Sequence, residues 1–119
     1  MTIEEALINE IQKTYPDMKM FEDEAELDEC PPYGVVSLVT GAPAFPAGET
    51  GTWQITLAHR DKTELKDLSK AVIKMFHGMR GDIGGMPVGS IWCIRNYKIS
   101  PKDDAGIMYK AQDFQIYYR

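Results

Sequence analysis

Two histidines and two cysteines are the side chains of this sequence best suited to hold a metal or to attack a substrate. They are His59, His77, Cys30 and Cys93, and no two of them have the short spacing typical of zinc sites. The serines offer no clear nucleophile, because none lies in a Gly-x-Ser-x-Gly elbow. We therefore expect no metal, no cofactor and no catalytic residue, and we interpret both cysteines as free thiols.

A glycine-rich stretch, GMRGDIGGMPVG at residues 78–89, has the composition of a phosphate-binding loop. Phosphate-binding loops follow a strand and precede a helix, so that free N–H groups at the helix start face the anion. Here the predicted helix comes first and the predicted strand follows, which is the opposite polarity. We interpret the stretch as a connector, and its RGD tripeptide at residues 80–82 as a chance occurrence.

The acidic run EDEAELDE, residues 22–29, lacks the glycine-punctuated alternation of oxygen ligands that binds calcium. Its density of like charge indicates a solvated loop. The whole chain has a formal net charge of -5, which weighs against a surface that grips nucleic acid, because such surfaces cluster lysine and arginine. We therefore expect no specific nucleic-acid binding.

Two amphipathic segments with capping signals predict the helices that must position these residues. Thr2 with Glu5 forms a capping box at the start of the first helix, and Asp61 with Glu64 repeats the arrangement at the start of the second. Gly78 lies where the second helix needs a C-terminal cap.

Five further segments have strand composition: residues 18–21, 33–40, 52–59, 90–99 and 108–119. The nearly continuous apolar content of 33–40 indicates a central strand covered on both faces. Residues 52–59 alternate between apolar and polar, with Trp53 on the apolar side, which predicts a half-buried strand. The alternating segment 108–119 is interpreted as an edge strand open to a neighbour.

The order helix, three strands, helix, two strands predicts the α+β class. We expect one mixed, mainly antiparallel sheet of four to five strands, with both helices packed on one face. At 119 residues and 44% hydrophobic content, we expect one domain covering residues 1–119. No apolar run approaches the ~20 residues that span a bilayer and neither end resembles a signal peptide, so we expect a soluble protein made in a cytosol, without a membrane partner.

The segment GAPAFPAGETG, residues 41–51, is long for a connection between two strands. Pro43 and Pro46 stiffen it, and Phe45 places an aromatic side chain near its tip. Because an apolar group held in water usually has a partner, we predict a protruding docking arm.

Taken together, the N-terminal amphipathic helix, PPY before a hydrophobic strand, the long arm, WQITLAHRD before a capped helix and the final AQDFQIYYR resemble the tail terminator proteins of long-tailed bacteriophages. These are also called tail-completion or tail-to-head joining proteins. The resemblance covers essentially the whole chain and depends chiefly on Pro32, Tyr33, Trp53, Asp61, Phe114 and Tyr118.

This resemblance implies an α+β subunit that forms a hexameric ring on the head-proximal end of a finished tail tube. The ring ends tube polymerisation and presents a surface to the head connector. The implied partners are further copies of the chain, the tail tube protein and the head connector protein. The implied location is the virion tail, assembled in the cytoplasm of the bacterial host, and no enzymatic activity is implied.

Interface residues are predicted from the arm, from nearby strand positions and from the enrichment of arginine at interfaces. They are Phe45, Trp53, Arg60, Arg80 and Arg119. Because DNA must pass through such a ring without sticking, part of the acidic run is predicted to face the lumen. These residues are Glu22, Asp23, Glu24 and Glu26.

Three alternatives remain open at this level. The first is a head-completion or neck connector protein that binds on the portal side. The second is a small cytosolic enzyme with His59 or Cys93 as the reactive group on the concave face of the sheet. The third is a monomeric binding domain that holds one partner with the Phe45 arm.

Overall fold

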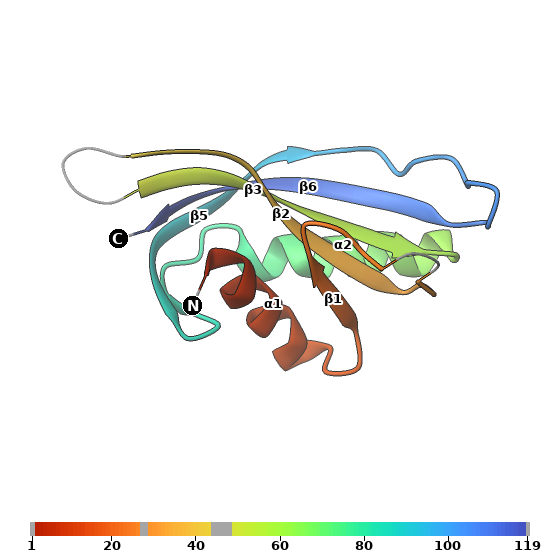
Figure 1. The fold of residues 1–119 in the computed structure, drawn as a ribbon, viewed down its shortest axis with the longest axis horizontal. Coiled ribbons are helices and arrows are strands. Elements are labelled where there is room, and N and C mark those ends of the chain that lie inside the picture. Colours follow the sequence, from red (N-terminus) through yellow and green to blue (C-terminus); the bar gives the residue numbers. More distant parts are fainter. Residues whose placement is uncertain (1, 27–28, 44–48, 119) are drawn as a thin grey trace.

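The computed structural model describes residues 2–26, 29–43 and 49–118. The elements are α1 (Ile3–Thr14), β1 (Lys19–Glu22), β2 (Tyr33–Pro43), β3 (Glu49–His59), α2 (Lys62–Phe76), β4 (Gly81–Ile83), β5 (Met86–Asn96) and β6 (Met108–Tyr118). All six strands form one sheet in the order β1-β2-β3-β6-β5-β4, and both helices cover one of its faces (Figure 1). β1 pairs with β2 in parallel, and the four other strand pairs are antiparallel.

The α+β class is therefore confirmed, whereas the expected four to five strands are six. The additional strand, β4, lies inside the glycine-rich stretch. It pairs with β5 through a tight turn in which Gly84 and Gly85 have φ angles of 54° and 92°. A strand of three residues that begins with a glycine carries too little pattern to be predicted. Most of the predicted connector is therefore a β-hairpin, formed by β4, the turn and the start of β5.

One prediction about strand position is wrong, and another holds only in part. β6, expected at an edge, lies in the centre of the sheet between β3 and β5. β2, expected to be covered on both faces, exposes Leu38 and Val39, and β1 pairs with it only as far as Val36. Sequence patterns report which faces of a strand are apolar, but they do not count its neighbours.

The predicted loop at residues 41–51 is largely strand. β2 and β3 stay paired up to Pro43 and Glu49, so they form a ribbon that extends past the helices (Figure 1). Residues 44–48 lie outside the described residues, and Phe45 is among them. The pairing of the strands therefore replaces most of the irregular arm expected from the prolines and glycines.

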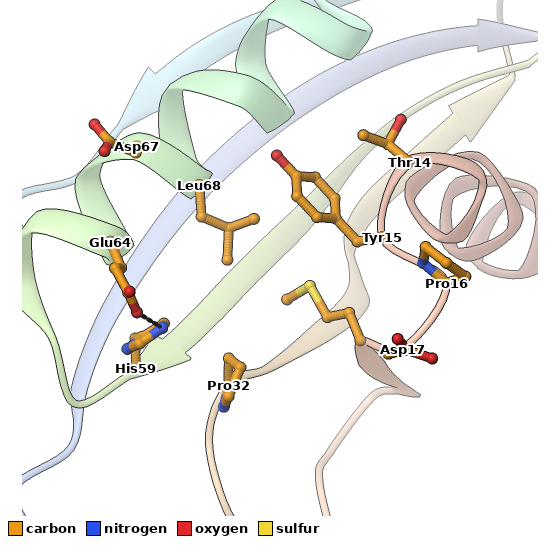
Figure 2. A pocket seen from close by; sticks show the side chains of 10 residues that line it. Thr14, Tyr15, Pro16, Asp17, Pro32, His59, Glu64, Asp67 and Leu68 are labelled. Carbon is orange, nitrogen blue, oxygen red and sulfur yellow. Dashed lines mark ion pairs between the residues drawn. The ribbon is translucent and has the colours of Figure 1, made fainter.

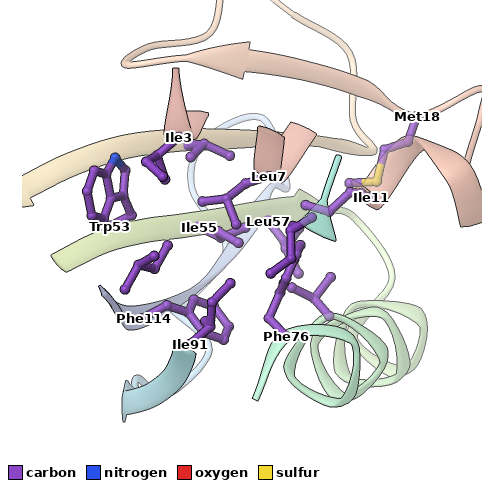
Figure 3. Close-up of a cluster of buried hydrophobic side chains, with 14 of the residues drawn as sticks. Ile3, Leu7, Ile11, Met18, Trp53, Ile55, Leu57, Phe76, Ile91 and Phe114 are labelled. Carbon is purple, nitrogen blue, oxygen red and sulfur yellow. The ribbon is translucent and has the colours of Figure 1, made fainter. Parts of the chain in front are cut away.

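The core lies between the helices and the sheet (Figure 3). Leu7 and Ile11 of α1 belong to one buried cluster with Ile55 of β3, and Phe76 of α2 packs edge to face on Phe114 of β6 with ring centroids 5.8 Å apart. These side chains are fully or almost fully buried, as the helical spacing and strand alternation require. A smaller cluster on the opposite face, around Tyr33, Ala58 and Ile107, closes one end of that face.

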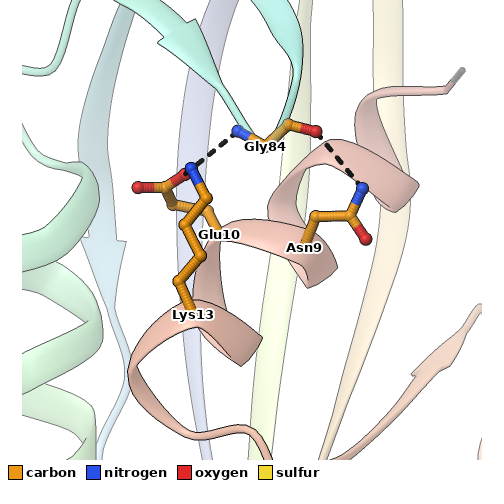
Figure 4. A network of polar contacts seen from close by, with 4 residues as sticks. All are labelled: Asn9, Glu10, Lys13 and Gly84. Atoms are coloured by element: carbon orange, nitrogen blue, oxygen red, sulfur yellow. Dashed lines mark hydrogen bonds and ion pairs between the residues drawn. The ribbon is translucent and has the colours of Figure 1, made fainter.

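The first helix also connects the two edges of the sheet. α1 contacts β1, β2 and β4, so the sheet curves around it into a half-barrel. Figure 4 shows how the tip of the β4–β5 hairpin is held: Asn9 Nδ2 donates to the carbonyl of Gly84 at 3.2 Å, and the Gly84 N–H donates to Glu10 Oε2 at 3.0 Å. Lys13 forms an ion pair with the same carboxylate oxygen at 3.0 Å. The hairpin thus fixes α1 to the β4 edge.

Both predicted capping boxes are confirmed in their N-cap halves. Thr2 Oγ1 accepts the N–H of Glu5 at 3.1 Å, and Asp61 Oδ1 accepts the N–H of Glu64 at 3.0 Å. Gly78 has a φ of 79° directly after the C-cap of α2, as expected for its position.

Replacing the N-cap of α2 tests how much this capping contributes. We expect Asp61→Ala to lower the free energy of unfolding by about 1 kcal/mol, because the Glu64 N–H loses its acceptor. Asp61→Asn, which keeps a side-chain acceptor, should stay within a few tenths of a kcal/mol of the wild type. Urea denaturation followed by circular dichroism measures both, and an equal loss in the two variants would contradict this role.

Candidate protein interface

His59 and Cys93, the reactive groups of the enzyme alternative, lie far apart. His59 is paired in the sheet with Met108, and Cys93 is paired with Phe114 of the same strand. Six positions along a strand correspond to roughly 20 Å at the ~3.4 Å rise per residue. The two side chains therefore do not share a site.

His59 lies at a cavity of about 540 Å³ between the end of α1 and the start of α2 (Figure 2). Its Nδ1 accepts the N–H of Asp61 at 2.9 Å, and its Nε2 lies 2.9 Å from Glu64 Oε2, to which the neutral ring can donate its N–H. Leu68, from the same helix as Glu64, and Tyr15, from the end of α1, also line the cavity. Because both ring nitrogens already have partners at the helix start, His59 serves to brace α2.

Cys93 is equally unsuited to nucleophilic chemistry. Burial raises the pKa of its thiol. Sγ also donates a hydrogen bond to the Arg95 carbonyl at 3.5 Å, which favours the protonated form. The neighbouring His77 uses Nδ1 to accept the backbone N–H of Cys93 at 3.0 Å, so it does not activate the sulfur. At neutral pH Cys93 is held as a neutral thiol, the poorly nucleophilic form.

Within residues 2–26, 29–43 and 49–118, no group of three or more histidine, cysteine, aspartate or glutamate side chains is placed to hold a metal ion. Over the same residues, the two helices are too short and too polar to cross a bilayer.

The three predicted interface residues that the structure describes, Trp53, Arg60 and Arg80, do not come together on one surface. Trp53 is 3% exposed, donates from Nε1 to the Glu4 carboxylate and packs edge to face on Tyr118, so its prediction as an interface residue is wrong. The alternation of β3 had placed it on the apolar side, and that side is the one the helices cover. Arg60, at the far end of β3, and Arg80, before β4, are exposed. Phe45 and Arg119 lie outside the described residues.

Five large hydrophobic side chains of the described residues are instead exposed; four of them lie on β2 and β5, and the fifth directly follows β5. Leu38 and Val39, here called the β2 patch, are 52% and 54% exposed. Trp92, Ile94 and Tyr97, here called the β5 patch, are 43%, 47% and 40% exposed. Contiguous apolar side chains at this exposure mark interaction surfaces more often than single exposed residues do.

The two patches lie at opposite ends of one row across the sheet. Leu38 is paired with Trp53, Trp53 with Phe114, and Phe114 with Cys93, which lies between Trp92 and Ile94. The register also shifts at both ends of the row, between Leu38 and Thr40 and between Cys93 and Arg95. Such bulges locally interrupt the ladder and reorient side chains. The patches therefore lie at the same height along the strands, on opposite flanks of the sheet.

The side chains of the β5 patch are held in place by neighbours. The Trp92 ring packs edge to face on His77, with ring centroids 5.3 Å apart. The hydroxyl of Tyr97 donates to Asp113 Oδ2 at 2.8 Å, and Asp113, only 2% exposed, also accepts from Gln54 Nε2 at 3.0 Å. A patch ordered before binding loses less conformational entropy when a partner arrives.

The predicted lumen residues Glu22, Asp23, Glu24 and Glu26 are all exposed. Desolvation, together with the nearby carboxylates of Glu5 and Glu4, raises the pKa of Glu22. The Asp23 N–H donates to the Val36 carbonyl at 2.9 Å, two residues before Leu38. The acidic surface therefore adjoins the β2 patch.

A signal for the β5 patch was present in the sequence. Residues 91–94, Ile-Trp-Cys-Ile, are apolar at four successive positions, so both faces of this strand carry apolar side chains. Both helices are expected on one face of the sheet. Apolar side chains of residues 91–94 that point to the other face therefore have no helix to cover them. The nearly continuous apolar content of residues 33–40 is the same kind of signal for the β2 patch, although it also fits a strand that is buried on both faces.

A scan against protein-family models finds no match for this chain, and a search of the curated proteins finds none either. Solved structures with a similar fold do exist. One is a chain in the virion of a native gene transfer agent particle, which is 15% identical and aligns with a TM-score of 0.61 over 90% of this chain and 82% of its own length. Another, whose name states no activity, is 12% identical and aligns with a TM-score of 0.59 over 98% of this chain and 92% of its own. The chain thus shares its fold, over most of its length, with a component of a gene transfer agent virion.

Proposed function

We propose that this protein is a structural subunit of a bacteriophage or phage-like virion, and that it assembles head to tail into a ring that caps the tail tube. The ring ends tube polymerisation and offers the surface on which the head connector docks. Its partners are further copies of the chain, the tail tube protein and the head connector protein. The protein performs no reaction in this role.

The pair of exposed apolar patches carries this proposal. A closed ring needs two different surfaces on each subunit, one for each neighbour. The β2 patch and the β5 patch are different surfaces at one height on opposite flanks. A rotation about an axis roughly parallel to the strands therefore brings the β2 patch of one subunit against the β5 patch of the next.

The setting in a virion is supported by the shared fold. Gene transfer agents are phage-like particles, and a chain of one such virion has this architecture. The tail terminator resemblance adds the position at the end of the tail. Two of the sequence features behind that resemblance, the N-terminal helix and the capped helix that follows WQITLAHRD, are present in the structure.

Mass measurement in solution tests the assembly. We expect native mass spectrometry and sedimentation of the purified protein to find monomers and six-membered rings, with the ring fraction rising with protein concentration. Electron microscopy of the larger species should show closed rings. A protein that remains monomeric at every concentration would favour the binding-domain alternative and contradict the proposal.

The neck connector is the remaining alternative within the virion, and the phenotype of a gene deletion separates the two. Loss of a tail terminator removes the stop to polymerisation, so tails of uncontrolled length are expected. Loss of a neck connector leaves tails of normal length that fail to join heads.

A further inference from the structure

A groove of about 850 Å³ lies between α2 and the segment that connects β5 to β6. Six lysines line it: Lys62, Lys66 and Lys70 from α2, Lys98 and Lys102 from the connecting segment, and Lys110 from β6. We call it the lysine groove. The three α2 lysines are spaced four residues apart, so they share one face of the helix.

The positive charge of the lysine groove is not neutralised within the described residues. No aspartate or glutamate lines it, and the ion pairs found in residues 2–26, 29–43 and 49–118 involve none of its lysines. Burial lowers the pKa of Lys110, whose ammonium donates to the Tyr97 carbonyl. Lysines gathered in this way repel one another, and an anionic partner relieves the repulsion.

The composition of the chain indicates what kind of anion fits. Six of the 13 lysines and arginines line the groove, which leaves seven against 18 acidic side chains over the rest of the chain. A long polyanion such as duplex DNA would have to cross that acidic surface, where it is repelled. A short acidic protein surface meets the groove alone, so charge favours a protein partner.

The chain itself carries such a surface. Glu22 and Glu24 lie close to the β2 patch, and Glu4 and Glu5 in the first turn of α1 extend the same negative region. The lysine groove adjoins the β5 patch in the same way, because Asn96 and Lys98, the neighbours of Tyr97, line it. Each flank of the subunit thus combines an apolar patch with charge, acidic beside β2 and basic beside β5.

We propose that the lysine groove of one subunit receives the acidic surface around Glu22 and Glu24 of the next copy of this chain. This inference depends on the proposed head-to-tail assembly, and it adds an ionic contact to the apolar contact between the β2 and β5 patches. Complementary charge fixes the direction of docking, because a β2 flank meeting another β2 flank, or a β5 flank meeting another, places like charges together. The proposal thus places Glu22 and Glu24 in the contact between subunits, and no longer in the lumen of the ring.

Two charge-reversal variants test the pairing. The groove variant carries Lys66→Glu and Lys70→Glu, and the acid variant carries Glu22→Lys and Glu24→Lys. All four side chains are exposed, so the fold should survive, as circular dichroism and thermal unfolding can verify. Alone, each variant should associate more weakly than the wild type by on the order of a hundredfold in Kd, because like charges face each other at every interface.

An equimolar mixture of the two variants gives the decisive measurement. The reversed groove of one variant then faces the reversed acidic surface of the other, and the remaining interface has wild-type charges. We expect native mass spectrometry to recover rings in which the two variants alternate, so that the number of subunits is even. Controls are Lys74→Glu, and Asp17→Lys with Asp82→Lys, all at exposed positions outside the groove and the acidic surface.

The other outcomes separate this inference from the proposed function. If the wild type does not associate, the proposed function fails. If the wild type forms rings and the groove variant forms them equally well, the ring proposal stands and this inference is overturned. The same holds if the acid variant forms rings as well as the wild type, as a lumen position predicts, or if the mixture does not recover. Binding of fluorescein-labelled duplex DNA by the wild type but not by the groove variant, with normal rings in both, would assign the groove to nucleic acid and also overturn it.

Discussion

We expect a Trp92→Asp variant to stay monomeric at protein concentrations at which the wild type associates into the proposed rings. Trp92 is the largest side chain of the β5 patch, it is 43% exposed, and His77 holds its ring in place. Ordered tryptophans at interfaces commonly contribute about 2 kcal/mol or more to binding, which is about 30-fold in Kd. A buried aspartate in its place adds the cost of desolvating a charge.

Leu38→Asp, on the opposite flank, should have the same effect, and the two variants together reveal the symmetry of the assembly. In a head-to-tail contact, the intact β5 patch of the Leu38 variant binds the intact β2 patch of the Trp92 variant. Analytical ultracentrifugation of the mixture should therefore find a one-to-one dimer and nothing larger. Thr63→Asp, exposed at the start of α2 and outside both patches, serves as the control and should assemble normally.

A different result is expected if the contact is symmetric. Were each patch to bind its own kind, the Leu38 variant would form dimers alone through its β5 patch. Unchanged rings in both single variants would remove the patches from the interface altogether, and with them the main support for the proposed function.

Gly84→Ala should lower the free energy of unfolding by about 2 to 4 kcal/mol, because the new methyl group meets the first helix. A Cβ at this position would lie 2.0 Å from the Ala6 carbonyl oxygen, which belongs to the backbone of α1. The backbone also has a φ of 54°, in the left-handed region that disfavours alanine. Since Gly84 bonds to both Asn9 and Glu10, the hairpin cannot move away without losing those contacts.

Gly106→Ala is the matched control for this effect. Its φ of 78° carries a similar backbone penalty, but nothing lies within 4 Å of a Cβ placed there. We expect a loss of about 1 kcal/mol, the cost of the left-handed conformation alone. Urea denaturation of both variants isolates the clash with α1, and equal losses would show that the close approach of Gly84 to Ala6 contributes little.

The local features of the fold could be predicted from the sequence because they depend on neighbouring residues. Thr2 and Asp61 mark the helix starts through side chains that reach only three residues ahead. Local alternation also predicts which side chains of a strand face the core. It places Trp53 inside, against its prediction as an interface residue. Predictions of this kind need no knowledge of distant partners.

What could not be predicted depends on residues far apart in the chain. The central position of β6 requires pairing with Glu49–His59 on one side and with β5 on the other, and no local pattern specifies either partner. The lysine groove joins three lysines of α2 with three from residues 98–110. Net charge conceals it, because the sum over the chain is negative while the local charge is positive. The two patches needed the register of four strands before they could be placed on one row.

The central position of β6 also determines when a newly made subunit becomes competent. Five strands precede β6 along the chain, yet β3 and β5 are joined only through it. While the ribosome is still making residues 108–118, β3 and β5 have no common neighbour and the row from Leu38 to Cys93 is interrupted. Such non-local pairing delays folding until after synthesis of the segment. In the proposed assembly, a nascent chain therefore presents both flanks in their final arrangement only after β6 has been made.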